Sequence, residues 1–299
     1  MNGVLATVVL PLSLAIIMLG MGTSLVVADF KRVLVFPRAV AIGIVGQILL
    51  LPVLGYFFAS QLNLTPENAV GVMVLVACAG GATSNLIVYL AKGDVALSVT
   101  LTAISSCITV ISIPFVINYA LYQFMGITEG AALPLGSTNI KLFMITLLPV
   151  MAGMVVRHFF PVFASRLEKP INKLATLFFI LIVAGLLIKE RNQWLAHLIN
   201  AGTVSFLLNV SSMVLGLLAA RLFLLNRQQS ITVSIEVGVQ NSATGIFIAT
   251  TLLNNSEIAV VPAVYSIVMY LNAGLLLGMM HWYAIRQRGQ VQLSSLKVE

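Results

Sequence analysis

The sequence predicts an all-α polytopic membrane protein, and its composition carries the prediction. Of the 299 residues, 60% are hydrophobic and only 8% are charged, whereas soluble domains carry about 25% charged residues. The mean hydropathy is +1.05. Apolar runs of this kind cross a lipid bilayer as helices, because a helix satisfies its own backbone hydrogen bonds. The net charge of +7 therefore belongs to loops at a membrane surface, and no nucleic-acid partner is expected.

We expect nine transmembrane helices. Each corresponds to a predominantly apolar run close to the length that crosses a bilayer. The runs lie at residues 4–27, 37–62, 67–91, 94–123, 140–160, 171–188, 202–224, 229–253 and 257–284. They divide the chain into a first part at 1–124 with four spans, an outside loop at 125–139, a second part at 140–286 with five spans, and a polar tail at 287–299.

The positions of Lys and Arg predict the orientation of these spans. Basic residues gather in cytoplasmic loops of membrane proteins. With the N-terminus outside, all but three of the 16 basic residues fall on the inner side, the exceptions being Lys141, Lys189 and Arg191. We therefore expect the N-terminus outside the cell and the C-terminus, with the polar tail, in the cytoplasm.

The second span contains a single buried polar residue. It begins at Pro37, a first-turn position that tolerates proline, and carries Gln47 within the apolar run. A lone glutamine in a membrane helix often makes a hydrogen bond between helices. From the span alone, Gln47 is equally an interhelical contact or part of a site.

Two of the spans are interrupted. In the third span, Gly80 and Gly81 precede Thr83, Ser84 and Asn85, and in the eighth span polar residues and a glycine occupy 236–242. Paired small residues also allow close helix packing, which is the simpler explanation of either interruption by itself. Broken helices in both halves of a polytopic chain favour the midplane binding site of a secondary transporter.

Glu236 lies in the second interruption and is the acidic residue placed deepest in an apolar run. A carboxylate at the bilayer centre costs about 3 kcal/mol or more. A protonated glutamate that is hydrogen-bonded to a neighbouring helix would avoid this cost. A site that binds a cation or a proton would offset it. Gln240 and Asn241 add polar atoms on the next turn and favour the site.

The fourth span carries a polar stripe. Ser98 and Thr102 begin a series of hydroxyl residues at three- and four-residue spacing, which places them on one helix face. Most such hydroxyls bond to the preceding turn of their own helix. Because a short turn at 92–94 folds this span back along the third one, Ser98 and Thr102 are also placed to face Ser84 and Asn85.

The interruptions resemble the two signatures of the bile acid:sodium symporter family. The first signature corresponds to residues 80–98 and the second to 236–242, and residues 20–31 resemble the entry into the family's first cytoplasmic loop. The resemblance implies two inverted repeats, divided into core and panel domains, with two discontinuous helices crossing near the midplane. It also implies a bacterial inner-membrane member with nine helices, whose first repeat lacks the family's first helix.

The resemblance implies two Na⁺ sites that share one carboxylate. Hard cations prefer oxygen ligands, which these residue types supply. The first site would use Ser84, Asn85, Ser98, Thr102 and Glu236. The second would use Gln47, Glu236, Gln240 and the backbone carbonyls of Val237 and Val239.

The implied substrate is an organic anion transported together with sodium. Half-helices that begin after each interruption offer free N–H groups and a positive dipole end to a carboxylate or sulfonate. The expected substrate-binding residues are Thr83, Ser84, Asn241, Ser242 and Asn272. We expect a small carboxylate such as pantoate or a keto acid, with a bile-acid-like anion as the other possibility.

Two other classes of function are also considered. A proton-coupled or arsenite-type carrier of the same superfamily would use a thiol near the first interruption, where Cys78 lies. A membrane-embedded enzyme would use Glu236 as acid or base, but the sequence shows neither a nucleophile motif nor metal-ligand spacing to accompany it. We therefore predict a transporter and no enzymatic activity.

Overall fold

The computed structural model describes residues 10–127, 133–189 and 194–295, and these residues are almost entirely helical. In chain order the elements are α1 (Leu10–Ser24), α2 (Val27–Lys31), the 3₁₀ turn η2 (Arg32–Leu34), α3 (Pro37–Val45), the π turn η3 (Gly46–Leu50), α4 (Leu51–Gln61), α5 (Pro66–Ala77), α6 (Ala82–Leu90), α7 (Val95–Met125), α8 (Leu135–Leu142), the π turn η4 (Phe143–Leu147), α9 (Leu148–Phe159), α10 (Pro161–Lys189), α11 (Trp194–Leu222), α12 (Arg227–Gly238), α13 (Ser242–Phe247), the π turn η5 (Ile248–Leu252) and α14 (Val260–Ser295).

The helices are those of a polytopic membrane protein. Within the described ranges, five are long and apolar enough to cross a bilayer, and α1 with α2 and η2 forms a sixth candidate that bends by 73°. The third and eighth expected spans are present as pairs of shorter helices, α5 with α6 and α12 with α13. The count of nine spans and the two inverted repeats stay predictions.

Several helices extend beyond the apolar runs that predicted them. Helix α8 begins at Leu135, inside the expected loop 125–139, and α10 begins at Pro161, before the expected start at 171. Helix α14 continues to Ser295, into the expected polar tail. Hydropathy marks where a helix meets lipid, whereas a helix ends only at a cap or a breaking residue. The first residues of the first span, 128–132 of the loop and 296–299 of the tail lie outside the described residues.

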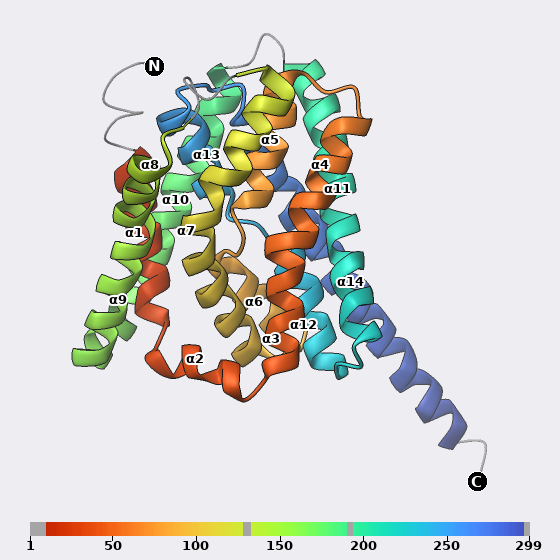
Figure 1. The fold of residues 1–299 in the computed structure, drawn as a ribbon. Coiled ribbons are helices and arrows are strands. Elements are labelled where there is room, and N and C mark those ends of the chain that lie inside the picture. The colour runs from red at the N-terminus through yellow and green to blue at the C-terminus, as the bar shows by residue number, and fades with distance from the viewer. Residues whose placement is uncertain (1–9, 128–132, 190–193, 296–299) are drawn as a thin grey trace.

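The two broken helices run in opposite directions through the middle of the bundle. Figure 1 shows α5 and α13 in its upper half and α6 and α12 in its lower half, with both breaks at mid-height. Helix α2, the start of α12 and the end of α14 lie at the lower end. The loops expected in the cytoplasm thus share one end of the molecule, although the orientation itself stays a prediction.

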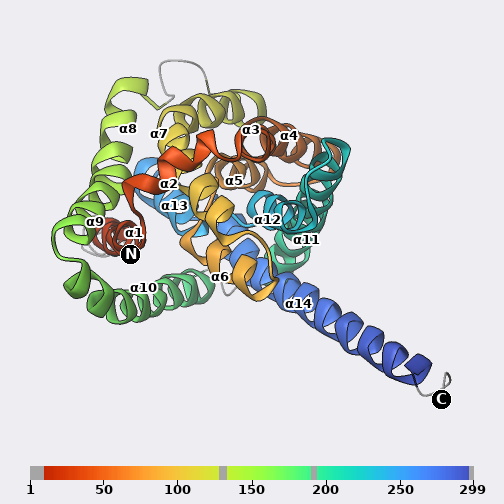
Figure 2. The ribbon, with the colours of Figure 1, turned by 90° about the horizontal axis from the view of Figure 1, so that it is seen from below.

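The remaining helices form two groups around this crossing. Seen from below, α1, α8, α9 and α10 lie on one side, and α3, α4, α11 and α12 on the other (Figure 2). Helix α1 packs mainly on α9 and α10. A Cβ atom on Gly22 would overlap the carbonyl of Val150, so α1 and α9 approach closely through small residues. We call α1, α8, η4, α9 and α10 the panel, and the other helices the core.

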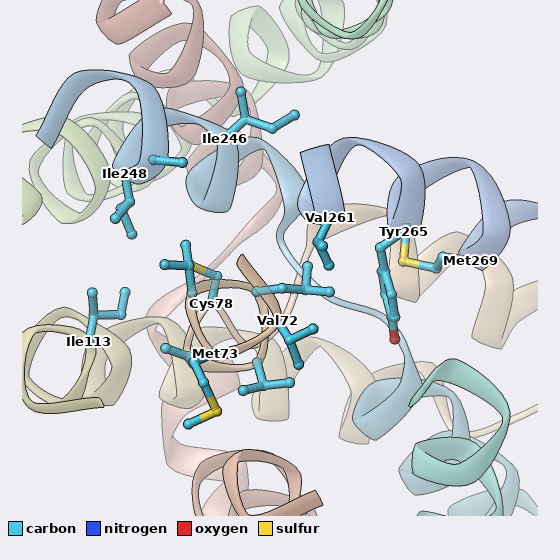
Figure 3. Packing of buried hydrophobic residues seen from close by; sticks show 14 of the residues in the cluster. Val72, Met73, Cys78, Ile113, Ile246, Ile248, Val261, Tyr265 and Met269 are labelled. Carbon is cyan, nitrogen blue, oxygen red and sulfur yellow. The ribbon is translucent and has the colours of Figure 1, made fainter. Parts of the chain in front are cut away.

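Helix α5 occupies the centre of the core. Its residues from Asn68 to Ala77 are all buried, as expected for a helix that is apolar on every face. Figure 3 shows its neighbours in the apolar cluster, which come from α7, α13, η5 and α14. Because α5 is enclosed, the break that follows it at 78–81 lies inside the protein and not against lipid.

Candidate functional site

The two breaks are hydrogen-bonded to each other. The first spans residues 78–81 and the second 239–241. The backbone N–H of Asn241 donates to the carbonyl of Cys78 at 2.8 Å, and Ala79 pairs with Gln240 in an isolated antiparallel bridge. Chain that leaves a helix inside a protein must find new partners for its polar groups. Here backbone polar groups of each break are hydrogen-bonded to those of the other break.

Both breaks are shorter than the sequence predicted. Thr83, Ser84 and Asn85 belong to the first turns of α6, and Glu236 belongs to the last turn of α12. The reason is that hydroxyl and amide side chains stabilise a helix start rather than delay it. Asn241 illustrates this, since its Oδ1 accepts the backbone N–H of Thr244 at 3.1 Å and caps α13.

Gly80 turns the chain at the first break. Its φ angle is +71°, in the left-handed region that side chains disfavour, and a Cβ atom there would lie 2.9 Å from Ser105 Oγ. The position therefore requires glycine for conformation and for space. This explains the first of the paired glycines in the sequence.

Glu236 is fully buried at the crossing and is surrounded by oxygen atoms. Its Oε1 accepts a hydrogen bond from Ser98 Oγ at 2.5 Å, and its Oε2 accepts one from Thr102 Oγ1 at 3.1 Å. Ser98 Oγ also lies 2.7 Å from Asn85 Oδ1, and Ser84 Oγ lies 3.3 Å from Thr102 Oγ1. The structure thus brings together all five residues expected at the first sodium site.

With Glu236 ionised, this cluster has more acceptors than protons. Ser98 Oγ lies within hydrogen-bond distance of both Glu236 Oε1 and Asn85 Oδ1, yet a hydroxyl has a single proton to donate. One oxygen pair is therefore left without a hydrogen between its members. A cation among these oxygens would remove the conflict, so the donor set fits a hard cation.

Two glutamines bond to the backbone carbonyls of Glu236 and of its neighbour Val237. Gln47 Nε2 donates to the Glu236 carbonyl at 2.8 Å, and Gln240 Nε2 donates to the Val237 carbonyl at 2.9 Å. The Oε1 atoms of both glutamines are buried without a hydrogen-bond partner. A buried acceptor without a partner is unfavourable. Two such atoms beside backbone carbonyls therefore also fit a cation.

Gln47 owes its position to a π turn. It is the second residue of η3, and Pro52 follows that turn in α4. Proline lacks the N–H that would continue the regular ladder, and π turns are frequent at functional sites. The turn places Gln47, from a distant span, against Glu236, and its role as a ligand stays a prediction.

A cavity of about 20 Å³ separates the panel from the core at the level of the breaks. This volume holds about one water molecule. The panel contributes Met18, Thr146 and Val150, and the core contributes Asn241 and Thr244 among others. The cavity also adjoins Cys78, Ala79, Ser106, Thr109, Val110, Ile113 and Leu147.

Comparison with known proteins identifies the family. The model of the sodium bile acid symporter family matches residues 11–197. The chain belongs to this family. It is 31% identical over 264 residues to the uncharacterized sodium-dependent transporter YocS of Bacillus subtilis, covering 88% of this chain and 80% of that protein.

Relatives also occur in plants and animals. The probable chloroplastic sodium/metabolite cotransporter BASS1 of Arabidopsis thaliana is 33% identical over 277 residues, or 92% of this chain and 67% of the plant protein. The human ileal sodium/bile acid cotransporter is 29% identical over 287 residues, or 93% and 80% of the two chains. The family confirms that this chain is a sodium-dependent membrane transporter and not an enzyme.

The residues expected to bind substrate are only partly gathered in this family member. Asn241 lines the cavity, and Ser242 Oγ next to it is buried without a hydrogen-bond partner. Thr83 is exposed on α6 and is not among the residues that line this cavity. Asn272, on α14, donates to Asn209 Oδ1 at 2.8 Å. Its role in substrate binding, like that of Thr83, stays a prediction.

Sequence reasoning missed several polar residues at the crossing. Thr244 Oγ1 is buried without a hydrogen-bond partner and lines the cavity, and Thr146 faces the same cavity from η4. Asn209 and Tyr265 bond to the end of α12. Of these residues, only Thr244 could have been predicted from the sequence, because it lies one turn after Asn241 in the interrupted span.

Proposed function

We propose that this chain is a sodium-coupled symporter of a small organic anion, working by alternating access between the panel and the core. The observation that carries the proposal is the fully buried Glu236. An unpaired carboxylate is costly at this depth. It has hydroxyls, amides and backbone carbonyls around it, but no basic residue is paired with it in the described structure.

Two sodium ions are proposed to share this carboxylate. The first would be held by Glu236 with the α6 and α7 oxygens of Ser84, Asn85, Ser98 and Thr102. The second would be held by Glu236 with the Oε1 atoms of Gln47 and Gln240 and the carbonyls of Val237 and Val239. Because the carboxylate is shared, occupation of one site affects the other.

The substrate is proposed to bind between the panel and the core. The start of α13 lies there, with Asn241 at its N-cap and with the unpartnered hydroxyl oxygens of Ser242 and Thr244. The start of α6 carries Thr83 and Ser84. Helix N-termini favour anions. A small carboxylate such as pantoate or a keto acid suits these groups. The human relative is named for bile acid, a larger anion.

Transport then requires the panel to move against the core. The present cavity holds about one water molecule, so even a small carboxylate needs a wider opening. Helices α1 and α9 are in close glycine contact within the panel, and the two breaks are hydrogen-bonded within the core. Each group is therefore built to move as a unit, with sodium inside the core and the substrate between the core and the panel.

The proposal is tested by uptake into proteoliposomes. Radiolabelled pantoate and small keto acids are offered under an inward sodium gradient, an inward potassium gradient, or a proton gradient alone. Accumulation is expected with sodium only, and Glu236→Ala should reduce it to background. Equal uptake with potassium would refute sodium coupling, and uptake driven by protons alone would assign Glu236 to proton transfer.

Cys78 supports a second candidate, an arsenite-type carrier. Its side chain is buried, and the residue lines the cavity beside Asn241. A thiol at this position could bind a trivalent metalloid. Expression in an arsenite-sensitive host distinguishes the two functions: tolerance that is lost with Cys78→Ser would favour this candidate, whereas anion uptake unchanged by the same substitution favours the symporter.

A further inference from the structure

The carbonyl of Gly238, the last residue of α12, accepts two hydrogen bonds from other helices. Tyr265 Oη donates to it at 2.7 Å, and Asn209 Nδ2 donates to it at 2.8 Å. Tyr265 is fully buried and Asn209 is 1% exposed. Figure 3 shows the Tyr265 ring within the apolar cluster, with its hydroxyl directed away from that cluster.

Three successive carbonyls end α12, and their partners differ. The Glu236 and Val237 carbonyls are bonded to the amide nitrogens of Gln47 and Gln240, whose own Oε1 atoms lack partners. A cation could replace those amide hydrogens. The Gly238 carbonyl has both lone pairs occupied by donors on α11 and α14, so it remains fixed when an ion enters or leaves.

A third residue holds this pair of donors in place. Asn272 Nδ2 donates to Asn209 Oδ1 at 2.8 Å, and Asn209 Nδ2 also lies 3.1 Å from Tyr265 Oη. The Asn209 amide is thereby oriented with its nitrogen toward Gly238. Tyr265 on α14 and Asn209 on α11 thus bond to the same backbone oxygen, that of Gly238. Helix α12 ends at Gly238, and residues 239–241 follow it.

We infer that Tyr265 and Asn209 are positioning residues for the second sodium site, and that Asn272 orients Asn209. The inference rests on the proposed function. By fixing the Gly238 carbonyl, the two donors set the direction of the Val237 and Val239 carbonyls on either side of it. A helix end fixed on one carbonyl presents its neighbours to the ion without reorganisation, whereas a free helix end would have to be ordered when sodium binds.

The test is Tyr265→Phe, which removes one oxygen atom and keeps the buried ring. The half-saturating sodium concentration for uptake, and for thermal stabilisation by sodium without substrate, is expected to rise about three- to tenfold, the loss of one net hydrogen bond. The substrate concentration for half-maximal uptake at saturating sodium should stay unchanged. Asn272→Ala should shift sodium dependence in the same direction by a smaller factor.

Ser266→Ala is the matched control. It removes a buried hydroxyl from the next position of α14, where Ser266 Oγ bonds only to Ala263 of its own helix at 2.6 Å. If Tyr265 has only a structural role, Tyr265→Phe will lower the melting temperature and leave the half-saturating sodium concentration unchanged. That result by itself overturns the inference. Wild-type protein without any sodium response would instead overturn the proposed function, and the inference with it.

Discussion

The backbone N–H of Asn241 donates to the carbonyl of Cys78 at 2.8 Å, although 163 positions separate the two residues in the chain. This bond joins the broken parts of two helices from opposite halves of the protein. It also brings the first turn of α6 and the last turn of α12 against the same two residues of α7, Ser98 and Thr102. Glu236 consequently contacts hydroxyls of α7 and the Gln47 amide of η3.

Glu236→Gln should abolish sodium-dependent uptake without unfolding the protein. The amide keeps the size of the carboxyl group and one acceptor oxygen, replaces the other oxygen with a donor, and removes the charge that two cations would share. A neutral group is also less costly to bury, so the ion-free variant should melt at or above the temperature of the wild type. Thermal shift with and without sodium checks both statements. A sodium-induced shift of wild-type size in the variant would contradict the assignment.

Thr102→Val should weaken sodium binding at least about tenfold, because it removes an oxygen proposed to contact the ion, and a polar contact with a charged group contributes about 1.5–3 kcal/mol. The substitution keeps the shape of the side chain and removes Oγ1, which lies 3.1 Å from Glu236 Oε2. The sodium concentration dependence of uptake is the measurement.

Thr100→Val provides the comparison for that variant. Thr100 lies on the same helix, is fully buried, and bonds to the carbonyls of Asp29 and Ala96 instead. It should lose stability while its sodium dependence stays that of the wild type. If both threonine variants shift sodium affinity equally, the effect is one of packing in α7 and not of ion coordination.

Much of this site could be predicted from the sequence, because its residues violate the rules for a lipid-facing helix. Glu236 and the glycine pair at 80–81 stand out in apolar runs, and both positions proved to lie at the crossing. The extent of each break could not be predicted, because Ser84 and Asn85 are compatible with loop and with the first turn of a helix.

Other residues of the site gave no such signal. Tyr265 and Asn209 are ordinary in a membrane helix, where tyrosine often marks the interface and asparagine a helix contact. Their function follows only from the position of Gly238, and the folded arrangement of α11, α12 and α14 determines that position. Thr146 likewise has meaning only because η4 faces the core across the cavity.

Gly80→Ala should destabilise the protein and disrupt the crossing. Alanine in the left-handed conformation costs about 1–2 kcal/mol, and its Cβ would also lie 2.9 Å from Ser105 Oγ. Gly126→Ala separates these effects, because Gly126 has φ +64° but no atom within 4 Å of the added Cβ. Thermal melting should show a larger loss for Gly80→Ala, and uptake should fall only in that variant. Equal melting temperatures would show that the approach to Ser105 has no effect.

Thr244→Val should weaken substrate binding and leave sodium binding intact. Its Oγ1 is buried without a hydrogen-bond partner, and the residue lines the cavity but makes no hydrogen bond to Glu236 in the described structure. Valine keeps the packing, so a polar group of the substrate loses one hydrogen bond, and the half-saturating substrate concentration should rise about three- to tenfold. The sodium-induced thermal shift without substrate is the internal control. Should that shift disappear while substrate affinity is unchanged, Thr244 would act on the ion sites, and the division between sodium at Glu236 and anion at the panel would be wrong.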